Sequence, residues 1–132
     1  RGKRMLRSPH KYYLVDTGLK RLFFNAAGED TGRMLENLVF LELKRRGYQV
    51  MTGVDHPGEI DFFAVRGEER HYYQVSLSIT DVNVRKRELG VLQRLKDNHP
   101  KTLLTMDYRP EENVDGIRIQ RVTDFFLNSA LV

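Results

Sequence analysis

Residues 59–79 read EIDFFAVRGEERHYYQVSLSI, and this stretch decides the fold that we expect. It divides into two extended runs, 59–65 and 71–79, on either side of the charged turn 66–69. Both runs are rich in apolar, aromatic and β-branched residues, which favour strands, and the glycine of the turn favours a tight reversal. The stretch therefore predicts two antiparallel strands joined as a hairpin.

Acidic and polar residues interrupt these two apolar runs. Side chains alternate between the faces of a strand, so we expect Glu59 and Asp61 to share a face with Phe63, and Ile60 and Phe62 to share the opposite face. The same alternation places Gln74 and Ser76 together on the second strand. If the hairpin forms, Asp61 and Gln74 lie near one another.

The segments around the hairpin extend it to a mixed sheet. From residue 30 onward the expected order is α-β-β-β-α-β, which predicts an α/β fold with helices flanking the sheet. Asp30 or Thr31 is expected as the N-cap of the clearest helix and Gly47 as its stop. The expected elements are an extended segment at 12–16, helices at 19–24, 30–46, 81–98 and 123–131, strands at 48–52, 59–65, 71–79, 101–106 and 116–122, and a loop at 109–113.

Glu36 is an acidic residue on the apolar side of the 30–46 helix. Its neighbours within about 60° on the helical wheel are Val39, Phe40 and Leu43. A buried carboxylate must be paired, hydrogen-bonded, neutralised or metal-bound. One explanation is a salt bridge to an arginine. The other is convergence with Asp61 and Gln74, because oxygen ligands from several elements suit Mg²⁺ or Mn²⁺.

Composition narrows the class of protein. The chain has 132 residues, 40% hydrophobic and 30% charged, which fits one globular domain and excludes a disordered or membrane-spanning chain. The absence of cysteine excludes thiolate metal sites and cysteine nucleophiles and favours a reducing compartment, so we expect a cytoplasmic protein with no membrane partner. No phosphate-binding loop of the G-x-x-x-x-G-K-[ST] kind occurs, so an ATP site is not expected.

Basic residues gather in two places, although the net charge is only +4. We interpret residues 1–11 as a basic arm or linker without a helix, ahead of a single domain at 12–132. The arm either contacts phosphates or is a solvated linker. Its start on Arg1 suggests a fragment of a longer chain. The basic residues in question are Arg1, Lys3, Arg4 and Arg7 in the arm, and Lys86 and Arg87 on the 81–98 helix, where Glu88 is read as part of a solvated face.

A helix acid, a strand aspartate and a strand residue-x-residue pair in this element order resemble the PD-(D/E)xK nuclease superfamily. More closely, the chain resembles the uncharacterised domain that follows the ATPase module in a family of prokaryotic AAA-type ATPases. The motifs that carry this likeness are KYY at 11–13, DTGL at 16–19, GRMLEN at 32–37, EIDF at 59–62, YQVS at 73–76, REL at 87–89, KTLLT at 101–105 and VTDFF at 122–126. The resemblance implies a restriction-endonuclease-like topology and an N-terminal ATPase module as a partner.

The resemblance also implies roles for single residues. Glu36 and Asp61 match the superfamily's metal ligands, and Gln74 stands where a second strand acid is usual. Ser76 stands where the superfamily carries the lysine that orients the attacking water. The implied catalytic set is therefore degenerate, and we expect a module that recognises DNA, RNA or a partner protein. Two alternatives stay open: an active Mg²⁺-dependent nuclease with a migrated lysine, Lys44 or Lys86, and a purely protein–protein regulatory domain.

Overall fold

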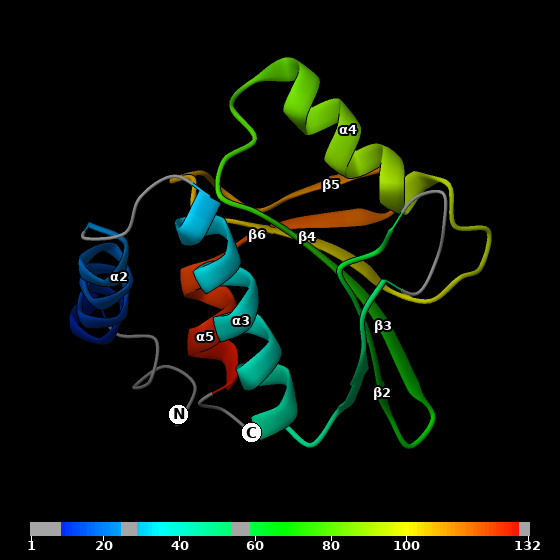
Figure 1. The fold of residues 1–132 in the computed structure, drawn as a ribbon, viewed down its shortest axis with the longest axis horizontal. Helices are drawn as coiled ribbons and strands as arrows, with labels where there is room; N and C mark the ends of the chain where they lie inside the picture. The colour runs from blue at the N-terminus through cyan, green and yellow to red at the C-terminus, as the bar shows by residue number, and fades with distance from the viewer. Residues whose placement is uncertain (1–8, 25–28, 54–58, 130–132) are drawn as a thin grey trace.

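The computed structural model describes residues 9–24, 29–53 and 59–129. At its centre lies a six-stranded sheet in the order β1-β2-β3-β4-β6-β5 (Figure 1). The strands are β1 Gln49–Met51, β2 Phe62–Arg66, β3 Glu69–Ser76, β4 Lys101–Thr105, β5 Glu112–Val114 and β6 Ile117–Arg121. The sheet is mixed and flanked by helices, so the predicted α/β class is confirmed.

The connections follow the predicted order. Strands β1, β2 and β3 form an antiparallel meander, with Arg66 paired to Glu69 across a two-residue turn. Helix α4 (Val82–Gln93) then carries the chain to β4, which is parallel to β3. Strand β6 lies parallel to β4 on its other side, and β5 pairs with β6 as an antiparallel edge strand.

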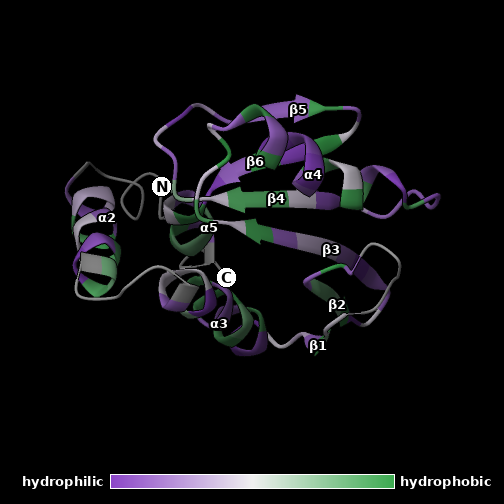
Figure 2. Ribbon diagram, turned by 45° about the horizontal axis from the view of Figure 1, so that its top comes forward, coloured by the Kyte–Doolittle hydropathy of each residue, from purple (hydrophilic) through white to green (hydrophobic). Residues whose placement is uncertain are grey.

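Helices cover both faces of the sheet (Figure 2). Helices α3 (Glu29–Arg45) and α5 (Val122–Ser129) pack on one face, and α4 packs on the other. The core on the α3 and α5 side includes Leu35, Leu43, Phe62, Val75, Leu104 and Phe125. The core on the α4 side includes Ile60, Tyr72, Leu92, Leu103 and Ile119. None of the helices in the described ranges has the length and apolar composition needed to cross a bilayer.

The N-terminal part differs most from the prediction. Residues Pro9–Phe24 form a single helix, α2, where we expected an extended segment, a turn and a brief helix. Pro9 stands at the first position of α2, where its missing N–H is not needed for the helix. Tertiary packing decides the rest, because α2 lies against α5 and places Leu19 in the core. The last part of the expected arm is thus helical, and residues 1–8 lie outside the described residues.

Helix boundaries were predicted with mixed success. Gly47 follows α3 with a φ of 93°, which a glycine adopts without strain, so the expected stop is confirmed. Asp30 and Thr31 lie inside α3, so neither is its N-cap. Asp81 does cap α4, accepting from the N–H groups of residues 83 and 84. Helix α4 ends at Gln93 rather than 98.

Strand β5 was missed by the sequence prediction. It occupies Glu112–Val114, where we expected part of a loop. Asp115 and Gly116 have φ values of 53° and 82° and join β5 to β6. An Asp-Gly pair in the left-handed region matches the tight hairpin turn that fits the twist of paired strands. The Asp115-Gly116 dipeptide therefore indicates a hairpin at this place in the sequence.

Candidate functional site

The site begins at a bend before β2. Asp61 precedes the first strand residue, so the alternation expected from residue 59 onward does not hold there. Ile60 packs in the core on the α4 side and Phe62 in the core on the α3 side, which separates two residues that we predicted on one face. Because β2 begins at Phe62 rather than at residue 59, Asp61 lies outside the strand and its side chain turns toward β3.

Asp61 is tied to β3 by two hydrogen bonds. Its Oδ2 accepts from the backbone N–H of Val75 at 2.9 Å. Its own N–H donates to Oε1 of Gln74 at 3.0 Å. The predicted proximity of Asp61 and Gln74 is therefore confirmed.

Gln74 bridges two elements with its amide group. The side chain is 6% exposed, and its Nε2 donates to Oε1 of Glu88 on α4 at 2.9 Å. Both ends of the amide are thus engaged, one by Asp61 and one by Glu88. A buried amide that is satisfied in this way fixes the distance between its partners.

Glu88 is the residue that sequence reasoning missed. It is half-buried on α4 rather than part of a solvated face, and it also pairs with Arg87 at 3.4 Å. The sequence does indicate that Glu88 faces the sheet. Val84, Glu88 and Leu92 recur every four residues on one side of the helix, and the two apolar residues pack on the sheet. The criterion that singled out Glu36 on α3 applies equally to Glu88.

Negative charge accumulates around these residues. Burial, together with the charges of Glu36, Glu88 and Glu59, raises the pKa of Asp61 to about 7 against the lowering effect of the Val75 hydrogen bond. Burial and the charge of Glu88 also raise the pKa of Glu36. Side chains from α3, α4 and the start of β2 therefore act on one another electrostatically.

One explanation for Glu36 was a salt bridge to an arginine, and the arginine whose charge acts on it is Arg33. Arg33, one turn earlier on α3, lowers the pKa of Glu36, but less than burial raises it. The Arg33 guanidinium makes its ion pair with Asp30 at 3.0 Å. The buried acid that does have arginine partners on α3 is Glu42, which pairs with Arg45 at 2.9 Å and Arg46 at 3.0 Å.

A metal site is not preformed by these carboxylates. Within the described ranges, no three His, Asp or Glu side chains are arranged to hold a metal ion. Glu36, Asp61 and Glu88 are electrostatic neighbours. The expected roles of Glu36, Asp61 and Gln74 as ligands to Mg²⁺ or Mn²⁺ stay predictions.

Ser76 stands where the resemblance implies a lysine in the nuclease superfamily. Ser76 Oγ donates to the carbonyl of Ser78 at 3.0 Å, a local contact. Lys44 and Lys86, the proposed replacements, are both exposed. Of the charged groups that shift the pKa of Asp61 or Glu36, Arg33 is cationic and the others are acids. The cluster is thus acidic, with partial compensation by Arg33 and by the exposed Arg87 that pairs with Glu88.

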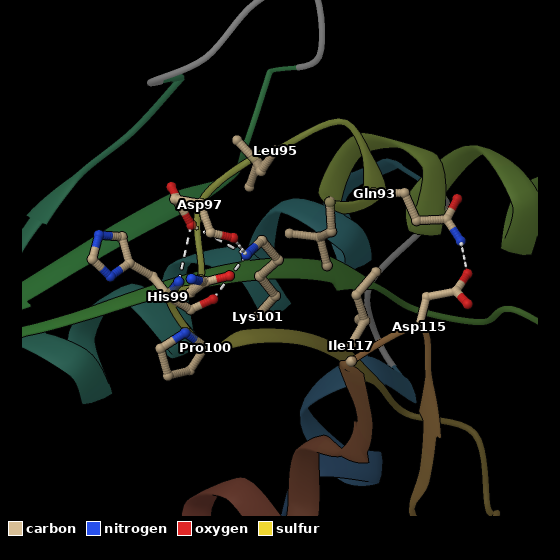
Figure 3. Close-up of a pocket in the computed structure, with 11 residues that line it drawn as sticks. Gln93, Leu95, Asp97, His99, Pro100, Lys101, Asp115 and Ile117 are labelled. Atoms are coloured by element: carbon tan, nitrogen blue, oxygen red, sulfur yellow. Dashed lines mark hydrogen bonds and ion pairs between the residues drawn. The ribbon is translucent and has the colours of Figure 1, made fainter.

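Two cavities lie near these elements. One of about 510 Å³ adjoins Glu36 and has an apolar floor made by Met34, Phe40 and Phe62. Another of about 580 Å³ lies between the end of α4 and the β5–β6 turn (Figure 3). In the second, Lys101 donates to Asp97, and Gln93 donates to Asp115. Those polar groups are paired with one another, whereas the first cavity gives access to Glu36.

The residues expected to bind nucleic acid are only partly described. Arg1, Lys3, Arg4 and Arg7 lie outside the described residues. Lys86 and Arg87 are exposed on α4 as expected, and Arg87 is paired with Glu88. The basic surface of α4 is therefore partly neutralised.

Comparison with known proteins relates the chain to parts of longer ones. No family model matches it. It is 39% identical over 127 residues to an uncharacterised protein of Haemophilus influenzae, covering 96% of this chain and 31% of that protein. It is 34% identical over 92 residues to an uncharacterised protein of Methanocaldococcus jannaschii, covering 66% of this chain and 20% of that protein. No solved structure matches. The chain thus spans less than a third of the curated relatives that it matches.

Proposed function

We propose that this chain is a nuclease-like domain of an AAA-type ATPase that has lost cleavage activity and recognises nucleic acid in the cytoplasm. The observation that carries the proposal is Gln74, whose amide is held at one end by Asp61 and at the other by Glu88. The uncharged amide of Gln74 stands where the nuclease superfamily usually has a second acidic residue on the strand, and Ser76 adds no charge beside it.

The electrostatics of the cluster support this view. Phosphodiester cleavage needs cationic groups that stabilise the charge developing on the phosphate. Here Glu36, Asp61 and Glu88 concentrate negative charge, and the ion pair of Arg33 is to Asp30. The order α-β-β-β-α-β and the adjacency of Asp61 and Gln74 fit the restriction-endonuclease-like topology that the resemblance implies.

Nucleic-acid binding by a cleavage-deficient variant tests the proposal. In the variant carrying Glu36→Ala and Asp61→Ala, we expect binding of DNA or RNA to persist and to weaken with salt, as phosphate contacts require. Removal of two exposed acids of the β2–β3 turn by Glu68→Ala and Glu69→Ala is the control for net charge. A metal-dependent cleavage activity of the natural chain that the first pair of changes abolishes contradicts the proposal.

An active nuclease is the second candidate, because Glu88 supplies a carboxylate beside Gln74. It requires Glu36, Asp61 and Glu88 to move into a ligand set. Incubation of plasmid and single-stranded DNA with Mg²⁺ or Mn²⁺ between pH 6 and 9 tests it, with Glu88→Gln as the diagnostic variant. Absence of cleavage throughout rules this candidate out, and absence of nucleic-acid binding at low salt favours a protein–protein role instead.

A further inference from the structure

A separate cavity of about 360 Å³ is lined by Tyr12, Tyr108, Arg109, Glu111, Arg121 and Asp124, among others. None of these residues lines the cavity beside Glu36. Strands β4 and β6 are parallel neighbours, and Arg121 ends β6 while Tyr108 and Arg109 follow β4. The cavity therefore opens at the carboxyl ends of two parallel strands, with α4 and α5 on opposite faces of the sheet. Open α/β sheets commonly bind ligands in a crevice at this edge.

Arg121 has hydrogen-bonding capacity to spare. The residue is 4% exposed, and its Nη2 donates to Asp16 at 3.1 Å. Its Nε is buried without a partner among the described residues. Arg109 pairs with Glu112, and its Nε is likewise buried without a partner. Guanidinium groups match the oxygens of a phosphate. Two arginines in the lining of one cavity therefore favour an anionic group in its ligand.

Tyr108 adds an aromatic surface to the same cavity. Its side chain is 87% exposed, and the Arg121 guanidinium carbon lies 4.4 Å from the centroid of its ring. The opposite face of the ring is open to solvent, which suits stacking of a second flat ring. Glu111, which pairs with Arg118 at 2.8 Å, and Asp124 disfavour a bare anion in the lining, whereas a ligand that also carries amino or hydroxyl donors suits carboxylate oxygens. The lining thus suits a ligand with an anionic group, a flat ring and hydrogen-bond donors.

We propose that this cavity binds a nucleotide unit, with its phosphate at Arg109 and Arg121 and its base against Tyr108. Recognition of a nucleic-acid strand at this place rests on the proposed function, whereas binding of a single nucleotide does not. The experiment below separates the two.

Titration of the whole chain with adenosine monophosphate, followed by calorimetry, tests the cavity. We expect Tyr108→Ala to weaken binding at least about fivefold, the low end of the effect of removing a stacking aromatic. Tyr108→Phe retains the ring and should bind as the natural chain does. Tyr13→Ala removes another tyrosine that is 67% exposed, on α2 and outside the cavity, and should leave binding unchanged. Adenosine and inorganic phosphate should each bind more weakly than the nucleotide.

Parallel titrations with ten-nucleotide single strands of DNA and of RNA distinguish the source of the nucleotide. Binding of adenosine monophosphate and of either strand with the same sensitivity to Tyr108→Ala supports a strand as the ligand. Binding of adenosine monophosphate alone supports a free nucleotide and contradicts the proposed function while the cavity proposal stands. Strand binding that ignores Tyr108→Ala, with no binding of the nucleotide, overturns the cavity proposal alone. Equal affinity for inorganic phosphate and the nucleotide also overturns it.

Discussion

Glu42 and Asp61 are both largely buried carboxylates, but Glu42 has arginine partners whereas Asp61 lies among other acids. Glu42 accepts hydrogen bonds from Arg45 and Arg46 at the end of α3, so its charge is compensated. Asp61 accepts from a neutral backbone N–H and lies among other acids, so its pKa is raised to about 7. Burial of a charge is tolerated only where a partner replaces the water.

Asp61→Asn should change stability in a pH-dependent way. The folded pKa of about 7 lies above the ordinary 3.8, so folding favours the protonated acid and stability falls as pH rises from about 4 through 7. The amide cannot ionise, so we expect the variant to gain about 1–3 kcal/mol over the natural chain at pH 8 and little at pH 4. Urea unfolding at both pH values measures this, with the exposed Glu68→Gln as control. An equal difference at both pH values contradicts the raised pKa.

Glu42→Ala should be among the more damaging substitutions in α3. It leaves the guanidinium of Arg46, which is largely buried against Phe125, without its carboxylate, at a cost of about 3 kcal/mol. The matched control is Arg45→Ala, which removes the exposed partner of the same acid and should cost less than about 1 kcal/mol. Urea unfolding of the two variants decides between them. Similar losses would mean that the exposed pair carries the stability.

At the scale of elements, glycines mark where helices and turns depart from ordinary backbone. Gly116 has a φ of 82° in the turn between β5 and β6. Gly90 lies inside α4, where a glycine lowers the helix propensity without preventing the helix. The same residue type is therefore required at one position and unfavourable at the other.

Alanine at these two glycines should act in opposite directions. A Cβ at Gly116 would meet nothing within 4 Å, so Gly116→Ala should cost about 1–2 kcal/mol purely through the left-handed backbone. A Cβ at Gly90 would meet the flexible end of Arg94 at 3.5 Å, so Gly90→Ala should stabilise by about 1 kcal/mol. Thermal unfolding of both variants checks the signs. Loss of stability in both would mean that packing rather than backbone preference decides.

At the scale of the whole molecule, α2 is a peripheral helix. It lies at one side of the molecule in Figure 1, with α5 as its main packing partner. Two kinds of contact hold it there. Leu19 packs in the core, and Asp16 accepts from Arg121 at 3.1 Å and from Thr123 at 3.0 Å. Elements with few anchors commonly open without global unfolding.

Leu19→Ala should therefore loosen α2 before the sheet. Loss of a buried leucine costs about 2–3 kcal/mol where the site can partly relax, and we expect it to appear as faster amide hydrogen exchange in α2. Exchange in β3 and β4 should change much less. Leu22→Ala, in the same helix but exposed, is the control and should leave exchange unchanged. A uniform increase across helix and sheet would show that α2 belongs to one cooperative unit with the sheet.

Local signals in the sequence predicted much of the fold. Alternating apolar residues indicated β2 and β3, the glycine-containing turn indicated their hairpin, and Gly47 indicated the end of α3. Periodicity also brought out Glu36 and the proximity of Asp61 to Gln74. These features depend on neighbours in the chain or across one turn, where the residue types are enough.

The tertiary structure alone decided the rest. Residues 12–16 carry β-favouring side chains yet are helical, because α2 gains its stability by packing on α5. The bend at Asp61, the bridge from Gln74 to Glu88 and the cavity at Arg121 each depend on side chains from elements distant in sequence. The sequence thus determined most of the elements that form and some of the residues that are out of place in them. Their partners, and so the charge of the site, follow from how α3, α4 and the sheet meet in space, which no local pattern encodes.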